Sequence, residues 1–163
     1  MTLGMSLSSF TTLHVTFSLI GIGAGLLVLF GLIAGRLLPM LTGLFLFATT
    51  VTSLTGFLFP FKGITPGIKI GVLSMAALAV AVAALYLFDL AGPSRTTFVV
   101  SAALALYFNV FVLIVQLFEK VPALHSLAPT LSEPPFKIAQ ASALAIFIAL
   151  TVLAVKRFRS ASI

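Results

Sequence analysis

The chain has no cysteine, no tryptophan and very few charged residues, and each shortage excludes a class of protein. Without cysteine there is no disulfide bond, no thiolate metal site and no iron–sulfur centre. Charged residues make up only 7% of the chain, whereas a soluble domain carries about a quarter. A soluble domain of 163 residues cannot hide this much apolar surface from water. The shortages therefore argue against a soluble protein.

Acidic residues are the scarcest charged type, with three acidic against nine basic residues and a net charge of +6. None of the three lies near the middle of an apolar stretch, so the carboxylate that ion-coupled transporters use is missing. The basic residues form no stripe interleaved with aromatic residues, which argues against nucleic-acid binding. They lie at the edges of apolar stretches, as in membrane proteins that contact anionic lipid headgroups.

Apolar residues dominate the rest of the chain, at 61% of residues and a mean hydropathy of +1.28. A helix crosses a hydrocarbon core with about 20 apolar residues, and a helix or a closed barrel satisfies its backbone there. We therefore predict an all-α integral membrane protein, a compact bundle of five transmembrane helices in one domain. The predicted spans are residues 12–34, 40–59, 66–89, 96–118 and 138–155, with one long outer loop, residues 119–136.

Five spans would place the two termini on opposite sides of the membrane. One side then holds Arg36, Arg95, Lys156, Arg157 and Arg159, and the other holds Lys62, Lys69, Lys120 and Lys137. The basic cluster after the last span favours a cytoplasmic C-terminus, so we predict an N-out/C-in orientation. The outer loop is rich in proline, which predicts an ordered lid over the bundle and argues against a flexible tether.

Glycines at four-residue spacing predict where the helices approach closely, because helices in lipid associate through tight packing. Such pairs are Gly21/Gly25, Gly31/Gly35 and Gly67/Gly71.

Polar side chains within the spans are the candidate functional residues, since burying them in hydrocarbon is costly. His14 and Ser18 share a face of the first span, and Asn109 and Gln116 share a face of the fourth. Ser53 belongs to a hydroxyl-rich run in the second span. Each could serve as a bond between helices or as a ligand contact. We predict no catalytic residue, and we predict ligand contacts at His14, Ser53, Asn109 and Gln116.

Histidine and carboxylate residues on the outer side are weaker candidates, for a metal site. They are His14, His125, Glu119 and Glu133. Their spacing matches no helical metal-binding pair such as HExxH, so no metal site is predicted. A haem held by two histidines of this chain would need His14 and His125 together.

Three segments resemble those of a widespread set of small, uncharacterised bacterial inner-membrane proteins. They are residues 52–60 (TSLTGFLFP), residues 105–113 (ALYFNVFVL) and residues 122–136, which contain PALH, LAPT and SEPPF. The resemblance covers most of the chain and implies a multi-pass protein of the bacterial inner membrane. It brings no established activity, so it assigns no functional residue.

The leading hypothesis is a non-enzymatic membrane module that binds a small apolar ligand, such as a lipid or a quinone, or a small subunit of a larger membrane complex. A redox protein that binds haem or a metal is the first alternative, and a small transporter or channel is the second. The expected partners are membrane lipids and, in an assembly, further copies or a larger complex. The cofactor is left unassigned.

Overall fold

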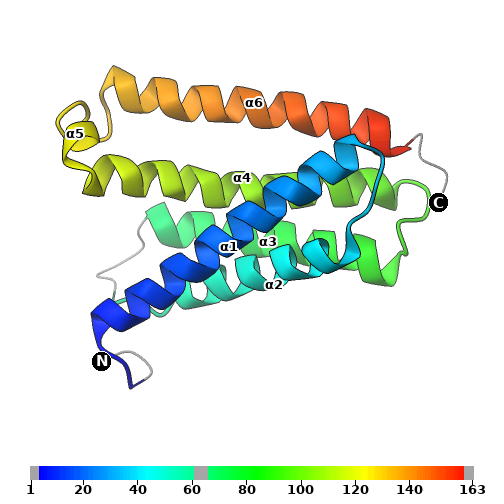
Figure 1. Cartoon of the computed structure of the whole chain (residues 1–163), viewed down its shortest axis with the longest axis horizontal. Coiled ribbons are helices and arrows are strands. Elements are labelled where there is room, and N and C mark those ends of the chain that lie inside the picture. The colour runs from blue at the N-terminus through cyan, green and yellow to red at the C-terminus, as the bar shows by residue number, and fades with distance from the viewer. Residues whose placement is uncertain (1–3, 61–65, 160–163) are drawn as a thin grey trace.

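The computed structural model describes residues 4–60 and 66–159, and within them the chain forms an all-α bundle (Figure 1). Its long helices are α1 (Leu7–Ile33), α2 (Pro39–Gly56), α3 (Pro66–Val82), α4 (Ser94–Lys120) and α6 (Pro134–Arg159). A π-helical turn, η1 (Ala83–Leu87), extends α3, and a single turn, α5 (Pro122–His125), precedes α6. Five helices of the described chain are long and apolar enough to cross a membrane, as predicted.

The start of α1 and the end of α2 differ from the predicted spans because a polar cap and proline, which hydropathy ignores, set them. Helix α1 begins five residues earlier than predicted, where the Ser6 hydroxyl accepts a hydrogen bond from the Ser9 N–H at 3.1 Å. Helix α2 ends at Gly56, short of the predicted residue 59, because Pro60 disfavours a helical conformation at the residue before it. Lys62 lies outside the described residues.

Helix α6 begins at Pro134, before the predicted span, because a hydrogen-bonded turn and proline precede its apolar residues, as the sequence Ser132-Glu133-Pro134-Pro135 indicates. The Glu133 carboxylate accepts a hydrogen bond from the Thr130 hydroxyl at 2.8 Å and from the Ser132 N–H at 3.1 Å. The bond from Thr130 holds the pKa of the exposed Glu133 carboxyl below its usual range. Pro134 then opens the helix, at a position where its missing N–H costs little.

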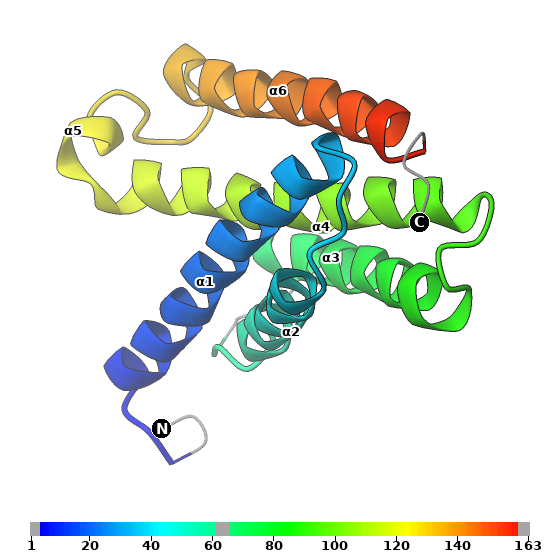
Figure 2. The same cartoon turned by 45° about the vertical axis from the view of Figure 1, so that its right-hand side comes forward.

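The helices pack as two antiparallel hairpins, α1 with α2 and α3 with α4, while α6 lies against α4 and α1. Helix α1 crosses the bundle obliquely, so its C-terminal half lies near α4 and α6 and its N-terminal half diverges from them (Figures 1 and 2). The hydrophobic core sits at the end where α1 is close, and it includes Leu29, Leu32, Phe98, Val99 and Phe158.

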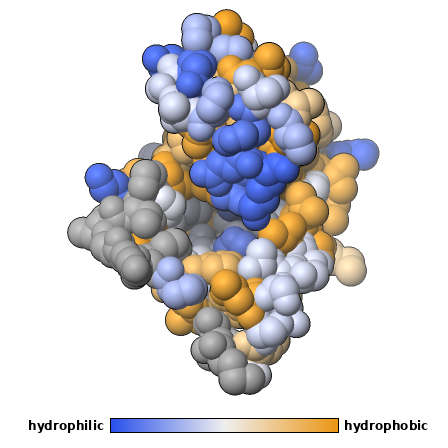
Figure 3. Space-filling view, turned by 90° about the vertical axis from the view of Figure 1, so that its left-hand side faces the viewer, coloured by the Kyte–Doolittle hydropathy of each residue, from blue (hydrophilic) through white to orange (hydrophobic). Residues whose placement is uncertain are grey.

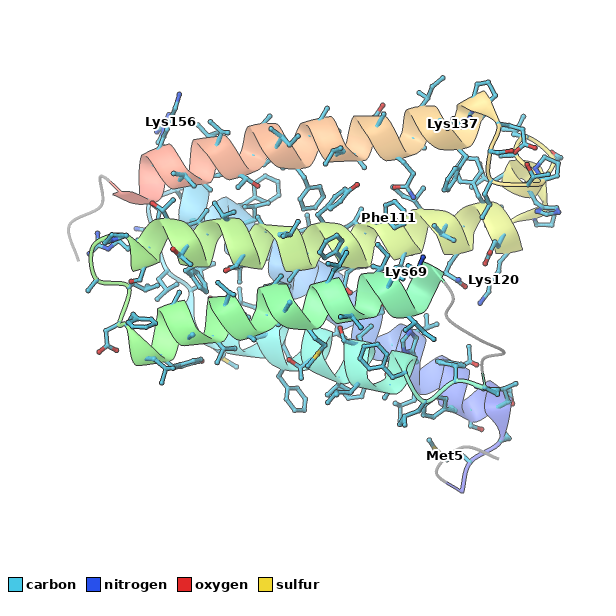
Figure 4. The ribbon with its side chains drawn as sticks, turned by 180° about the vertical axis from the view of Figure 1, so that it is seen from behind. Met5, Lys69, Phe111, Lys120, Lys137 and Lys156 are labelled. Atoms are coloured by element: carbon cyan, nitrogen blue, oxygen red, sulfur yellow. The ribbon has the colours of Figure 1, made fainter. Side chains whose placement is uncertain are left out.

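Helix α6 is the most peripheral of the five long helices, with large apolar side chains such as Ile146 and Ile148 exposed. Exposure of this kind suits a helix that faces lipid. On its inner face, Gln140 Nε2 donates to the backbone oxygen of Phe111 at 3.1 Å and ties α6 to the middle of α4 (Figure 4).

Two predicted glycines of α1 are points of close helix contact. A methyl group on Gly25 would lie 2.7 Å from a Leu106 side-chain atom and 2.8 Å from the ring of Phe45. One on Gly21 would lie 3.0 Å from Thr49 Oγ1. Gly25 therefore meets both α2 and α4 and lets three helices meet at one level.

The prediction that Gly31 and Gly35 form a helix–helix contact is wrong, because both belong to the turn that ends α1. Gly35 has a φ of 73°, and the Arg36 N–H bonds back to the Gly31 oxygen at 2.8 Å. This geometry terminates a helix and requires the left-handed conformation that glycine adopts readily. A methyl group on Gly31 would meet Leu38 and Arg36 of the same turn.

The alanine substitution Gly25→Ala should destabilise the bundle by about 1–3 kcal/mol, since the added methyl group overpacks a buried junction. Gly23→Ala is the matched control, because a methyl group at Gly23 meets nothing within 4 Å. Unfolding of both variants in detergent would measure the difference. Equal stability of the two variants would contradict the close contact at Gly25.

Candidate ligand-binding cavity

A cavity of about 680 Å³ lies between α1, α2, α3 and α4, at the end of the bundle where α1 begins and α4 ends. It occupies the space left where the N-terminal half of α1 diverges from α4. Figure 3 shows a hollow on this end of the molecule, with hydrophilic side chains above it and apolar ones around it. The volume falls in the range of about 300–1,000 Å³ typical of small-molecule sites.

The cavity walls are mainly apolar, with a minority of polar side chains from all four helices. Apolar lining residues include Leu19, Phe57, Ile70, Phe108, Val112 and Leu113. The polar ones include His14, Ser18, Ser53, Ser74, Asn109 and Gln116. All four predicted ligand contacts, His14, Ser53, Asn109 and Gln116, thus line one cavity. That they bind a ligand stays a prediction.

The His14 imidazole joins α1 to α2 near the mouth of the cavity. Its Nδ1 lies 2.8 Å from Thr55 Oγ1, and its ring meets the ring of Phe59 edge-on with centroids 5.2 Å apart. Thr55 also donates to the Val51 backbone oxygen at 2.7 Å, so its hydroxyl serves both contacts. Thr55, the partner of His14, is not among the residues predicted from the sequence.

The antiparallel pairing of α1 with α2 would have predicted the contact between His14 and Thr55. Contacts between α1 and α2 run from Gly25 with Phe45 to Gly21 with Thr49. Stepping further back along α1 and forward along α2 brings His14 opposite Thr55. The tight turn after residue 34 fixes this register.

Asn109 bonds two helices and also lines the cavity, so its role between helices is confirmed and its role as a ligand contact stays a prediction. Its Nδ2 donates to Thr49 Oγ1 at 3.2 Å, which links α4 to α2 across a junction that Gly21 of α1 also reaches. Asn109 is only 7% exposed and Thr49 is fully buried. The carbonyl oxygen of Asn109 accepts no hydrogen bond from the described residues, and the side chain lies at the cavity wall.

The serine hydroxyls of the cavity differ in how well they are satisfied. Ser53 donates to Ser74 across α2 and α3 at 3.4 Å, a long and weak bond. Ser18, one turn from His14 on α1, makes no hydrogen bond with the described residues. The cavity therefore offers free hydrogen-bonding capacity at this level.

The mouth of the cavity carries polar and cationic side chains at the end of α4. Gln116 Nε2 donates to Glu119 Oε2 at 3.3 Å, and Lys120 lines the cavity. Lys69 of α3 lies at the same end of the bundle (Figure 4). Gln116 and Lys120 are at the edge of the site, whereas Asn109 is deep within it.

The expectation that the outer loop closes over this end is wrong for the cavity. Of the predicted outer loop, residues 119–136, Lys120 and Val121 line it, and both stand at the end of α4. None of residues 122–136 does, because α5 packs against α4 and the loop leads away to α6 (Figure 1). His125 lies on α5, so it is not a neighbour of His14 in the cavity. Among the described residues, no three histidine or acidic side chains gather as a metal site would require.

No family model, curated protein or solved structure matches this chain. The resemblance to small bacterial inner-membrane proteins stays a prediction, and function has to be argued from the cavity.

The bond between Asn109 and Thr49 should appear as an energetic coupling between α4 and α2. In a double-mutant cycle of Asn109→Leu and Thr49→Val, we expect about 0.6 kcal/mol, as for comparable bonds in membrane bundles. A parallel cycle with Thr50→Val is the control, since the Thr50 hydroxyl bonds its own helix at Leu46. Unfolding free energies in detergent give both couplings, and equal values would refute the interhelical bond.

Proposed function

We propose that this protein is a non-enzymatic, multi-pass membrane module that binds a small apolar ligand with a polar end, of the lipid or quinone class. The cavity between α1 and α4 is the binding site. The observation that carries the proposal is the convergence of polar side chains from several helices on one largely apolar cavity. Apolar walls with a few placed polar groups are the usual composition of a small-molecule site.

Some polar groups of the cavity are left unmatched by the described residues, as are Thr42 Oγ1 and Gln140 Oε1 outside it. A bundle held by interhelical bonds would leave few polar atoms unmatched, because unmatched atoms at membrane depth cost free energy. Here the Ser18 hydroxyl and the Asn109 carbonyl oxygen have no partner among the described residues. A ligand or water that enters the cavity would satisfy them.

The packed core at the other end of the bundle favours binding over passage. The cavity ends below Asn109, where Leu106 and Phe45 close on Gly25. Beyond this level large side chains, including Phe98 and Phe158, fill the space between the helices. A pathway through the protomer would have to displace this core, so the transporter or channel hypothesis has less support.

The hypothesis of a haem or metal redox protein has less support than ligand binding for a similar reason. His14 is the sole histidine that lines the cavity, and the carboxylates Glu119 and Glu133 do not line it. A role as a small subunit of a larger complex remains compatible with the apolar face of α6, which lipid alone would also cover.

We also propose the N-out/C-in orientation and a bacterial inner-membrane location. Arg36, Arg95, Lys156 and Arg157 belong to the end of the bundle opposite the cavity mouth, and Lys69, Lys120 and Lys137 belong to the mouth end (Figure 4). The cluster after α6 then faces the cytoplasm by the positive-inside rule. In this orientation the cavity mouth faces the outer side.

Filling the cavity should remove the ligand without disturbing the fold. In native mass spectrometry we expect the wild type to carry a bound lipid- or quinone-sized mass and Ser18→Phe to lack it. The phenyl ring would fill the cavity, and the substitution would break no hydrogen bond, since Ser18 makes none with the described residues. Ser142→Phe is the matched control on the exposed face of α6 and should keep the ligand. If the wild type carries no ligand, or both variants keep it, the proposed site is wrong.

A further inference from the structure

The imidazole of His14 has two nitrogens, and the structure assigns a partner to one of them. Nδ1 bonds Thr55 Oγ1, whereas Nε2 has no hydrogen-bond partner among the described residues. The ring lines the cavity, and its Cε1 lies 3.6 Å from where a methyl group on Gly56 would stand, an ordinary van der Waals contact. What Nε2 offers to a ligand therefore depends on which nitrogen carries the proton.

The contacts of Thr55 decide the position of that proton. A threonine hydroxyl has one hydrogen to donate and can also accept. Thr55 Oγ1 lies 2.7 Å from the Val51 carbonyl oxygen, which can only accept. When Thr55 donates to Val51 and accepts from His14 Nδ1–H, both contacts are hydrogen bonds. The reverse arrangement forms only the bond from Thr55 to His14.

A neutral imidazole with a proton on Nδ1 presents a bare lone pair at Nε2. Deeper in the cavity, the carbonyl oxygen of Asn109 is a second acceptor, since its Nδ2 is already engaged with Thr49. The imidazole of His14 and the amide of Asn109 thus each present a hydrogen-bond acceptor to the cavity. The Ser18 hydroxyl, which can donate or accept, lies one turn from His14.

We propose that the cavity selects ligands whose polar end donates a hydrogen bond, such as a phenol, an alcohol or the quinol form of a quinone, with His14 Nε2 as the acceptor. This inference rests on the proposed function and names the chemical class of the ligand. A ligand end that can only accept, such as a quinone carbonyl or an ether, would place its lone pair against that of Nε2. It would bind through an extra water or after a change of tautomer.

A matched pair of probes tests this preference. 4-Nonylphenol and its methyl ether, 4-nonylanisole, have the same tail and differ in whether the head donates. We expect the phenol to bind the wild type about tenfold more tightly, the effect of one hydrogen bond to a buried acceptor. Affinities are measured in detergent by competition between the two probes, with Ser18→Phe as the background for binding outside the cavity.

Two variants locate the preference at His14. His14→Asn keeps an amide that can donate to Thr55 but has no atom at the Nε2 position, so the tenfold preference should vanish. Thr55→Val keeps His14 but removes the contact that holds its proton on Nδ1, so both tautomers form and the preference should fall without vanishing. Thr50→Val is the control, because Thr50 does not line the cavity, and it should keep the full preference.

The outcomes separate this inference from the function on which it rests. Equal binding of phenol and ether to the wild type, above the Ser18→Phe background, would overturn the selection for donors and leave ligand binding intact. A preference that survives in His14→Asn would place the acceptor elsewhere and overturn the role of Nε2. If neither probe nor any native lipid binds above background, both proposals fail. A reduced but remaining preference in Thr55→Val supports the inference even if His14→Asn does not fold, and an unchanged preference there would overturn it.

Discussion

The close approach of α1 to α2 and α4 at Gly25 is the contact on which the rest of the structure depends. A methyl group at Gly25 would come within 3 Å of Leu106 and Phe45, so those side chains would have to shift to admit one. This contact fixes the point where α1 crosses the bundle. On one side of it the helices close into a core of phenylalanine, leucine and valine. On the other side α1 diverges, and the cavity fills the space that the divergence leaves.

The cavity differs from the packed half in how its polar side chains bond the neighbouring helices. In the packed half, the hydroxyl of Ser101 bonds a carbonyl of its own helix, and the buried hydroxyl of Thr42 has no partner among the described residues. In the open half, His14 and Asn109 each bond α2 through one atom, Nδ1 and Nδ2. The second polar atom of each side chain has no partner among the described residues. A residue of this kind both positions itself and presents an acceptor. That is how one set of side chains can stabilise the bundle and also contact a ligand.

Hydropathy was sufficient to predict five helices, because their length and composition are a direct demand of the hydrocarbon core. Helix ends were less predictable, since Ser6 and Pro60 act through hydrogen bonds and sterics that hydropathy ignores. The same glycine spacing marked a helix contact at Gly21 and Gly25 and a helix end at Gly31 and Gly35. Spacing alone does not separate these two uses, whereas the short turn that follows Gly35 does.

The candidate residues could be named from the sequence, but their convergence could not. Each was recognised because a polar group in an apolar span is costly, and that argument treats every helix by itself. Whether the groups meet depends on which face of each helix turns inward and on how α1 tilts. The expected lid failed for a related reason, because proline content predicts a defined path for the outer loop without its direction.

The open half of the bundle is the proposed site of a bound ligand. The most direct measurement is an experimental structure of the wild-type protein in lipid nanodiscs, at a resolution that shows bound molecules. We expect continuous density in the cavity, from the mouth near Lys120 towards Asn109, with a polar end within hydrogen-bond distance of His14 Nε2. A collapsed cavity, with α1 packed against α4 along its whole length, would contradict it.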